Sequence, residues 1–200
     1  MELMSRFLMQ PSRTASNFLK DCSGIGAIEF AFIAPLMLVM FFGTVEFAQG
    51  VGANRKVTIM ARTLSDLTSQ NTSVTQAQLD NFFAAATAVM TPYSAAPVRS
   101  TISELYIDPN TQTAHVQWSV GSAPRTQGST VAIPTQLIAR DAQNNVVANQ
   151  YLIYSEVTYQ YVPTIGYVMA PGGVNLRDVA YTRPRQSTCV MYNTQVCTTL

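Results

Sequence analysis

The hydrophobic residues of this chain are concentrated in one run near its amino end. Residues 25–48 read IGAIEFAFIAPLMLVMFFGTVEFA, and no basic residue lies between Lys20 and Arg55. A helix over this run would reach roughly 36 Å at about 1.5 Å per residue, which is enough to cross a hydrocarbon layer of about 30 Å. Glu29 and Glu46 bracket its uncharged part and would lie near the two interfaces, where a carboxylate costs less than at mid-bilayer. We therefore expect residues 25–48 to form a transmembrane helix in contact with membrane lipid.

A polar, partly basic leader, residues 1–24, precedes the run, and we expect it on the cytoplasmic side. Within the run, Pro35 removes one backbone hydrogen bond, so we expect a helix kink near this residue. A cleaved secretory signal is the competing interpretation, because an apolar core of about 15 residues followed by Ala and Gly also suits such a signal. A soluble domain would then be released near Ala53 and begin at about Asn54.

The helical spacing of apolar residues continues past the run. Residues at intervals of three and four predict that the helix extends to about Thr68 as an amphipathic stalk over 49–70; they are Gly52, Lys56, Ile59, Met60, Thr63, Leu64 and Leu67. After a polar break, Thr75 and Gln78 have the spacing of a capping box. A second, shorter helix is expected from there to just before Thr91-Pro92, with an apolar face of Leu79, Phe82, Phe83, Ala86 and Met90.

From Val98 onward the pattern is typical of strands. Residues 101–107 and 113–120 flank Asp-Pro-Asn-Thr, which predicts a hairpin, and further strands are expected over 130–138, 151–162 and 179–192. Alternation in the second hairpin strand places Ala114, Val116, Trp118 and Val120 on one face and His115, Gln117 and Ser119 on the polar one. The predicted fold is α+β, with the long N-terminal transmembrane helix, its amphipathic extension, a second short helix and an antiparallel sheet. The sheet would belong to an α+β domain over 71–200.

Composition narrows the function further. Charged residues make up 12% of the chain, and 12 basic residues against 11 acidic ones leave a net charge of +1, so no field would attract nucleic acid. Three cysteines and one histidine fit none of the zinc spacings, and we expect neither a metal nor another cofactor. Neither a nucleophile elbow nor a phosphate-binding glycine loop is present, and Glu104 and Asp108 are interpreted as exposed strand charges. We therefore do not expect this protein to be an enzyme.

Two cysteines near the carboxyl end bear on the orientation. Three basic residues precede the run and three follow it closely, so charge alone does not decide which side is cytoplasmic. Cys189 and Cys197 would most simply close a short loop as a disulfide, which requires an oxidising compartment and places the C-terminal domain outside the cytoplasm. The alternative is two unpaired thiols in a frayed tail. Cys22, before the run, would stay reduced.

The start of the apolar run, Gly24-Ile25-Gly26-Ala27-Ile28-Glu29-Phe30, resembles the processing signal of type IV pilins. In that signal a membrane peptidase cuts after a glycine, and the new chain has a glutamate as its fifth residue. Cutting after Gly24 would make Ile25 the first residue and Glu29 the fifth. The wider string EFAFIAPLMLVMFFGTVEFAQG resembles the TadE-like family, which comprises pseudopilin-type proteins of the bacterial Flp or Tad (tight adherence) pilus system. The resemblance covers about residues 24–50.

This resemblance implies a minor pilin in the bacterial inner membrane, crossing once, with its C-terminal domain in the periplasm or in the pilus. Its partners would be a prepilin peptidase, other pilin or pseudopilin subunits and the pilus assembly machinery. Glu29 and Phe30 would then act in subunit assembly, with the Glu29 carboxylate pairing with the α-ammonium of a neighbouring subunit. For Glu29 the alternative is that its negative charge near the start of the helix simply interacts favourably with the helix macrodipole. For the whole chain the alternative is an uncleaved anchor whose tyrosine-rich strands bind a surface, a wall polymer or a partner subunit.

Overall fold

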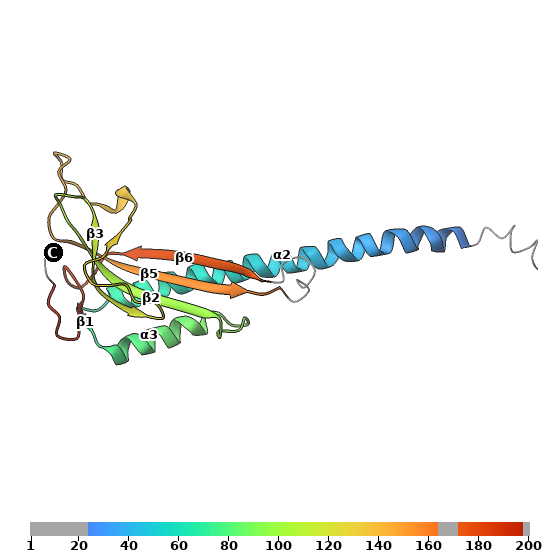
Figure 1. The fold of residues 1–200 in the computed structure, drawn as a ribbon, viewed down its shortest axis with the longest axis horizontal. Helices are drawn as coiled ribbons and strands as arrows, with labels where there is room; N and C mark the ends of the chain where they lie inside the picture. The colour runs from blue at the N-terminus through green and yellow to red at the C-terminus, as the bar shows by residue number, and fades with distance from the viewer. Residues whose placement is uncertain (1–23, 164–171, 198–200) are drawn as a thin grey trace, which may run out of the picture. The chain divides into compact units, whose positions relative to one another are not determined.

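The computed structural model describes residues 24–163 and 172–197 (Figure 1). The expected leader therefore lies outside the described residues, except for Gly24. The described chain contains two α-helices, a five-stranded antiparallel sheet and a two-stranded parallel sheet, so the α+β prediction is confirmed. It divides into two units, with the boundary between Val45 and Glu46.

The first helix, α2, runs without interruption from Ile25 to Ser69 and contains Pro35. It has the length and apolar composition of a membrane span, and no part of its most apolar stretch is buried among the described residues. The prediction that the helix continues to about Thr68 is confirmed, because α2 ends one residue later. A kink at Pro35 stays a prediction.

The second helix, α3, extends from Gln76 to Ala88, and its start has the predicted capping box. The Thr75 hydroxyl accepts a hydrogen bond from the Gln78 backbone N–H, and the Thr75 N–H donates to Gln78 Oε1 at 2.9 Å. These reciprocal bonds satisfy two of the amide groups that a helix start leaves without partners. Leu79 and Ala86 are buried on its inner face, as the spacing predicted.

The larger sheet has the strand order β4-β3-β2-β5-β6, with every neighbouring pair antiparallel (Figure 1). Its members are β2 (Val98–Ile107), β3 (Ala114–Gly121), β4 (Thr130–Val131), β5 (Gln150–Tyr161) and β6 (Val174–Thr182). The predicted hairpin is confirmed as β2 and β3, joined by the Asp-Pro-Asn-Thr turn. The central pair, β2 and β5, stays in register from Val98 opposite Tyr159 to Ile107 opposite Gln150.

Two predicted strands were wrong in their extent. Only Thr130–Val131 of the expected 130–138 strand joins the sheet, because Pro134 lacks an N–H for the ladder and instead precedes a short 3₁₀ turn, η2 (Thr135–Leu137). The expected 179–192 strand is two elements: β6, which begins earlier at Val174, and β7 (Met191–Tyr192). The short β7 pairs in parallel with β1 (Ser73–Val74).

The predicted alternation in β3 was also wrong, because the strand contains a bulge. Glu104 pairs with Trp118, but the next β2 residue, Leu105, pairs with Val116, so Gln117 is an extra residue. A single inserted residue moves every following side chain to the opposite face. Trp118 therefore lies in the same core cluster as Ile102, whereas Val116 lies in the cluster of Leu105.

Each face of the sheet carries its own apolar core. The cluster on one face includes five α2 residues, Ala53, Val57, Met60, Ala61 and Leu64, packed with residues of α3 and the sheet. The cluster on the other face is closed by the loops around β4 and η2 through Val131 and Ile138. The helical stalk is therefore part of the folded unit. Its inner face differs from the predicted one. Of the seven residues of the predicted stripe only Met60 and Leu64 are buried, and Ile59 is 43% exposed.

Candidate functional site

Within the apolar run, residues 25–45 of α2 form an exposed surface of large hydrophobic side chains. Phe30 is 67% exposed and Phe32 is 80% exposed, and the same holds for most of the run. Its other large exposed members are Ile25, Ile28, Ile33, Leu36, Met37, Leu38, Val39, Met40, Phe41, Phe42 and Val45. A continuous apolar surface of this size on a protein indicates contact with lipid or with other protein chains.

The residues of the processing motif lie where α2 begins. Gly24 directly precedes the first helical residue, Ile25, and the exposed Glu29 follows one turn later. A Cβ at Gly24 would meet nothing within 4 Å, so the fold itself does not require glycine there. The cleavage after Gly24 and the assembly roles of Glu29 and Phe30 stay predictions.

Two tyrosines contact α2 at the carboxyl end of the apolar run. The Tyr161 hydroxyl donates to Glu46 Oε2 at 3.2 Å, and the Tyr93 hydroxyl donates to the Gln49 carbonyl at 3.0 Å. Their rings meet edge to face with centroids 6.5 Å apart. Burial, followed by the hydrogen bond to Glu46, raises the pKa of Tyr161 to about 12, so this hydroxyl keeps its proton at physiological pH. We call Tyr93 and Tyr161 the tyrosine pair.

Glycines in α2 make room for this contact. A Cβ at Gly52 would lie 2.5 Å from the Tyr93 hydroxyl oxygen, so the end of the Tyr93 side chain would have to shift to accommodate it. At Gly50 a Cβ would lie 3.6 Å from the Tyr161 ring, an ordinary contact. The expected stripe included Gly52, but its spacing alone did not show that a side chain 41 residues away in sequence would approach it so closely.

Further along the stalk, polar bonds join α2 to the edge of the sheet. Thr58 donates to the Asp178 carboxylate, and the Ser65 and Thr182 hydroxyls are 2.7 Å apart. The chain after β6 adds a backbone bond from the Arg185 N–H to the Ser69 carbonyl at 2.9 Å. Because these bonds join residues more than a hundred positions apart, they hold residues 58–69 of α2 against the edge of the sheet.

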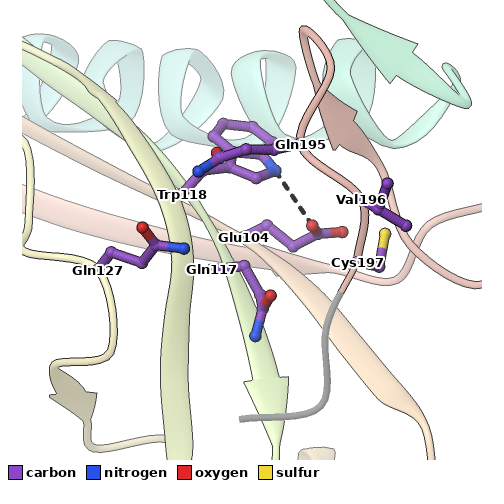
Figure 2. Close-up of a pocket in the computed structure, with 7 residues that line it drawn as sticks. All are labelled: Glu104, Gln117, Trp118, Gln127, Gln195, Val196 and Cys197. Carbon is purple, nitrogen blue, oxygen red and sulfur yellow. Dashed lines mark hydrogen bonds between the residues drawn. The ribbon is translucent and has the colours of Figure 1, made fainter.

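The prediction that Glu104 is an exposed strand charge was wrong, because its side chain is only 1% exposed. Its carboxylate accepts a hydrogen bond from the Val190 N–H at 2.5 Å and one from Trp118 Nε1 at 3.1 Å (Figure 2). Trp118 Nε1 also donates to the Val190 carbonyl at 2.8 Å. Burial raises the pKa of Glu104 to about 8, since the two neutral donors offset only part of the cost of losing water.

Asp108 lies away from Glu104, in the turn after β2. It accepts hydrogen bonds from the Asn110 N–H and the Thr111 hydroxyl, which lower the pKa of its carboxyl group. The two acids are four positions apart along an extended chain, a distance of roughly 13 Å. The structure therefore does not bring them together as a pair for acid-base chemistry.

A small pocket adjoins Glu104 beneath the carboxyl-terminal segment. Its volume is about 260 Å³, and Figure 2 shows its lining of Glu104, Gln117, Trp118, Gln127, Gln195, Val196 and Cys197. Cys197 forms a disulfide with Cys189, which directly precedes Val190. Tyr192 stacks on Trp118 with ring centroids 5.6 Å apart. Residues 189–197 thus form a closed loop that covers the buried acid and is held by it.

Replacing Glu104 with Gln should flatten the pH dependence of stability. The folded protein keeps a proton on Glu104 up to a pKa of about 8, whereas an ordinary glutamate releases it near 4.5. The unfolding free energy should therefore fall as pH rises from about 4.5 to about 8, by on the order of a few kcal/mol. Urea unfolding of the detergent-solubilised protein across this range measures the effect. Other titrating groups are common to both proteins, so parallel curves for the wild type and Glu104→Gln would contradict the assignment.

His115 is half-buried and hydrogen-bonded rather than simply solvated. Its Nε2 lies 2.9 Å from the Thr113 hydroxyl, and its Nδ1 lies 3.3 Å from the Gly128 carbonyl. Within residues 24–163 and 172–197, no three His, Cys, Asp or Glu side chains are grouped so that they could hold a metal ion. The contacts of His115 are therefore hydrogen bonds within the folded domain.

Comparison with known proteins identifies the amino-terminal part of the chain. No curated protein and no solved structure matches the chain significantly. One family model does match, that of the TadE-like protein, over residues 24–64. This match begins at Gly24, includes the whole apolar run and ends within the stalk at the buried Leu64. Residues 24–64 are therefore a TadE-like family domain.

Proposed function

We propose that this protein is a membrane-anchored minor pilin, or pseudopilin, that acts in the assembly of a Flp/Tad-type type IVb pilus and has no enzymatic activity. The leader, residues 1–24, would lie in the cytoplasm, residues 25–48 would cross the inner membrane, and the stalk and the α+β domain over 71–200 would lie in the periplasm. The observation that carries the proposal is the TadE-like match on a helix whose large apolar side chains are exposed.

The chemistry of the apolar run suits both environments that such a subunit would occupy. In the membrane its side chains would contact lipid tails, and in a filament they would contact equivalent helices of other subunits. Removal of the leader after Gly24 would place a new α-ammonium one helical turn from Glu29. The Cys189–Cys197 disulfide supports an oxidising location for the C-terminal domain.

The alternative is an uncleaved anchor whose extracytoplasmic domain binds a partner protein or a surface. It is favoured by the extent of the α+β unit, most of which lies outside the TadE-like match. The tyrosines of β5 do not supply its binding surface, because Tyr151, Tyr154, Tyr159 and Tyr161 are all at most 7% exposed. Any such binding would use other parts of the domain.

Replacement of the apolar run distinguishes the two. Substituting Ile25–Val45 with a Leu-rich helix of equal length preserves an anchor but removes the specific helix surface. If the helix itself assembles, cells with this variant should lose their pili while the protein remains in the membrane fraction. Normal pili from a membrane-retained variant would contradict the minor-pilin proposal and support the anchor.

A further inference from the structure

The end of the sheet that carries Tyr161 lies beside the point where α2 would leave the bilayer. Tyr161 bonds to Glu46 and packs near Gly50, and Tyr93 bonds to the Gln49 carbonyl. These α2 residues are at or just beyond the end of the proposed span at residue 48. A side chain that touches them must therefore lie close to the level of the lipid headgroups.

Exposed apolar side chains gather around this end of the sheet. Val162 directly follows Tyr161 in the chain and is 61% exposed, and Val174, which pairs with Tyr161 across β5 and β6, is 47% exposed. On α2, Phe47 and Val51 are 74% and 54% exposed. From Glu46 onward, the described part of the chain has seven large exposed hydrophobic residues, and these four are the majority. Their concentration at one end indicates a partner there.

The polar groups near these side chains fit a membrane interface. Arg55 and Lys56 follow residue 48 by about two helical turns, or roughly 10 Å, which long basic side chains can span to reach lipid phosphates. Glu46, the acid nearest this surface along α2, is hydrogen-bonded to Tyr161.

We propose that this surface, formed by Phe47, Val51, Val162 and Val174, inserts into the interfacial layer of the periplasmic leaflet. The inference rests on the proposed membrane anchoring of α2. The tyrosine pair joins the sheet to α2 at this level, so the end of the folded domain lies against the lipid. The partner is the bilayer itself, since the helix that carries half of the surface emerges from it. A second copy of the chain covering these side chains is the competing occupant.

Brominated lipids test the contact, because bromine on the acyl chains quenches only tryptophans that reach them. The full-length protein with Val162→Trp is reconstituted in vesicles of phosphatidylcholine and phosphatidylglycerol, with or without bromine on the acyl chains. Val147→Trp is the matched control: Val147 is 42% exposed and precedes β5, whose 12 residues separate the two sites by roughly 36 Å. The native Trp118, 5% exposed, gives the background in both variants.

The emission added by Val162→Trp should be mostly lost in brominated vesicles, and the emission added by Val147→Trp should be unchanged. Vesicle flotation of the same samples reports anchoring separately. If the protein floats with the vesicles but Val162→Trp is not quenched, the lipid contact is overturned while anchoring stands. If the emission of Val162→Trp instead changes with the number of protein molecules per vesicle and is the same with and without bromine, the surface contacts a second copy of the chain, and the lipid contact is overturned. A protein that does not float would refute the anchoring itself.

Discussion

Glu29→Ala should abolish pili while leaving the protein in the membrane at its normal level. Glu29 is exposed one turn into α2, and the carboxylate is proposed to neutralise the α-ammonium of a neighbouring subunit. Without it, each added subunit would bring an unpaired positive charge into an apolar helix bundle, which costs several kcal/mol. Counting pili by electron microscopy and quantifying the protein in membrane fractions together measure the effect.

Conservative variants show whether the charge is responsible. Glu29→Asp keeps the carboxylate and should retain some pili, whereas Glu29→Gln keeps the shape and should behave like Glu29→Ala. If Glu29 only favours the helix macrodipole, its loss would cost about 0.3–1 kcal/mol of helix stability and pili would form normally. Normal piliation of Glu29→Ala would therefore exclude the assembly role.

Met60→Ala should lower the unfolding free energy by about 2–5 kcal/mol, the range for truncating a large side chain in a packed core. Met60 is fully buried between α2 and the sheet, so its removal leaves a cavity that the neighbouring side chains fill only in part. Urea unfolding of the detergent-solubilised protein measures the loss. The variant should also reveal that the stalk is part of the domain core.

The neighbouring residue provides a matched control. Ile59 is 43% exposed, and Ile59→Ala should change stability much less than Met60→Ala. The sequence spacing placed both residues on the apolar face of the stalk, whereas the structure buries only Met60. An equal or larger loss from Ile59→Ala would mean that α2 packs on the sheet through a different face.

The parts of the fold that were predictable are those with local signals. An uninterrupted apolar run and the three-and-four spacing after it predicted α2, and the capping box at Thr75 predicted the start of α3. The Asp-Pro-Asn-Thr turn predicted the β2–β3 hairpin. In each case the residues that determine the structure are neighbours in the chain, so the pattern contains the necessary information.

Features that depend on distant residues were missed. The bulge at Gln117 leaves no mark in the apolar alternation, and it separates Val116 from Trp118. Glu104 is buried because Val190, 86 positions away, covers it and donates a hydrogen bond. The two-residue strands β1 and β7 are too short to show any periodicity. Sequence alone does not show which of these segments meet.

The candidate site divides in the same way. Gly24 and Glu29 were found from a short motif and their roles need no contact within the chain, so the fold neither requires nor excludes them. The tyrosine pair was not found, because Tyr161 and Glu46 are 115 positions apart and nothing near either residue indicates the other. Gly52 lies close to the end of the Tyr93 side chain, and the sequence around either residue does not indicate this contact.

The central claim is that α2 crosses the membrane and places the disulfide-bonded domain outside the cytoplasm. Thiol counting in intact spheroplasts, with a membrane-impermeant reductant and a membrane-impermeant polymer-linked maleimide, tests it directly. Cys189 and Cys197 should react only after reduction and without lysis, and a third thiol, Cys22, should react on lysis only if the leader is retained. The account would be contradicted if Cys189 and Cys197 react only after lysis and then react without reductant. The first result would contradict the orientation, and the second would contradict the disulfide.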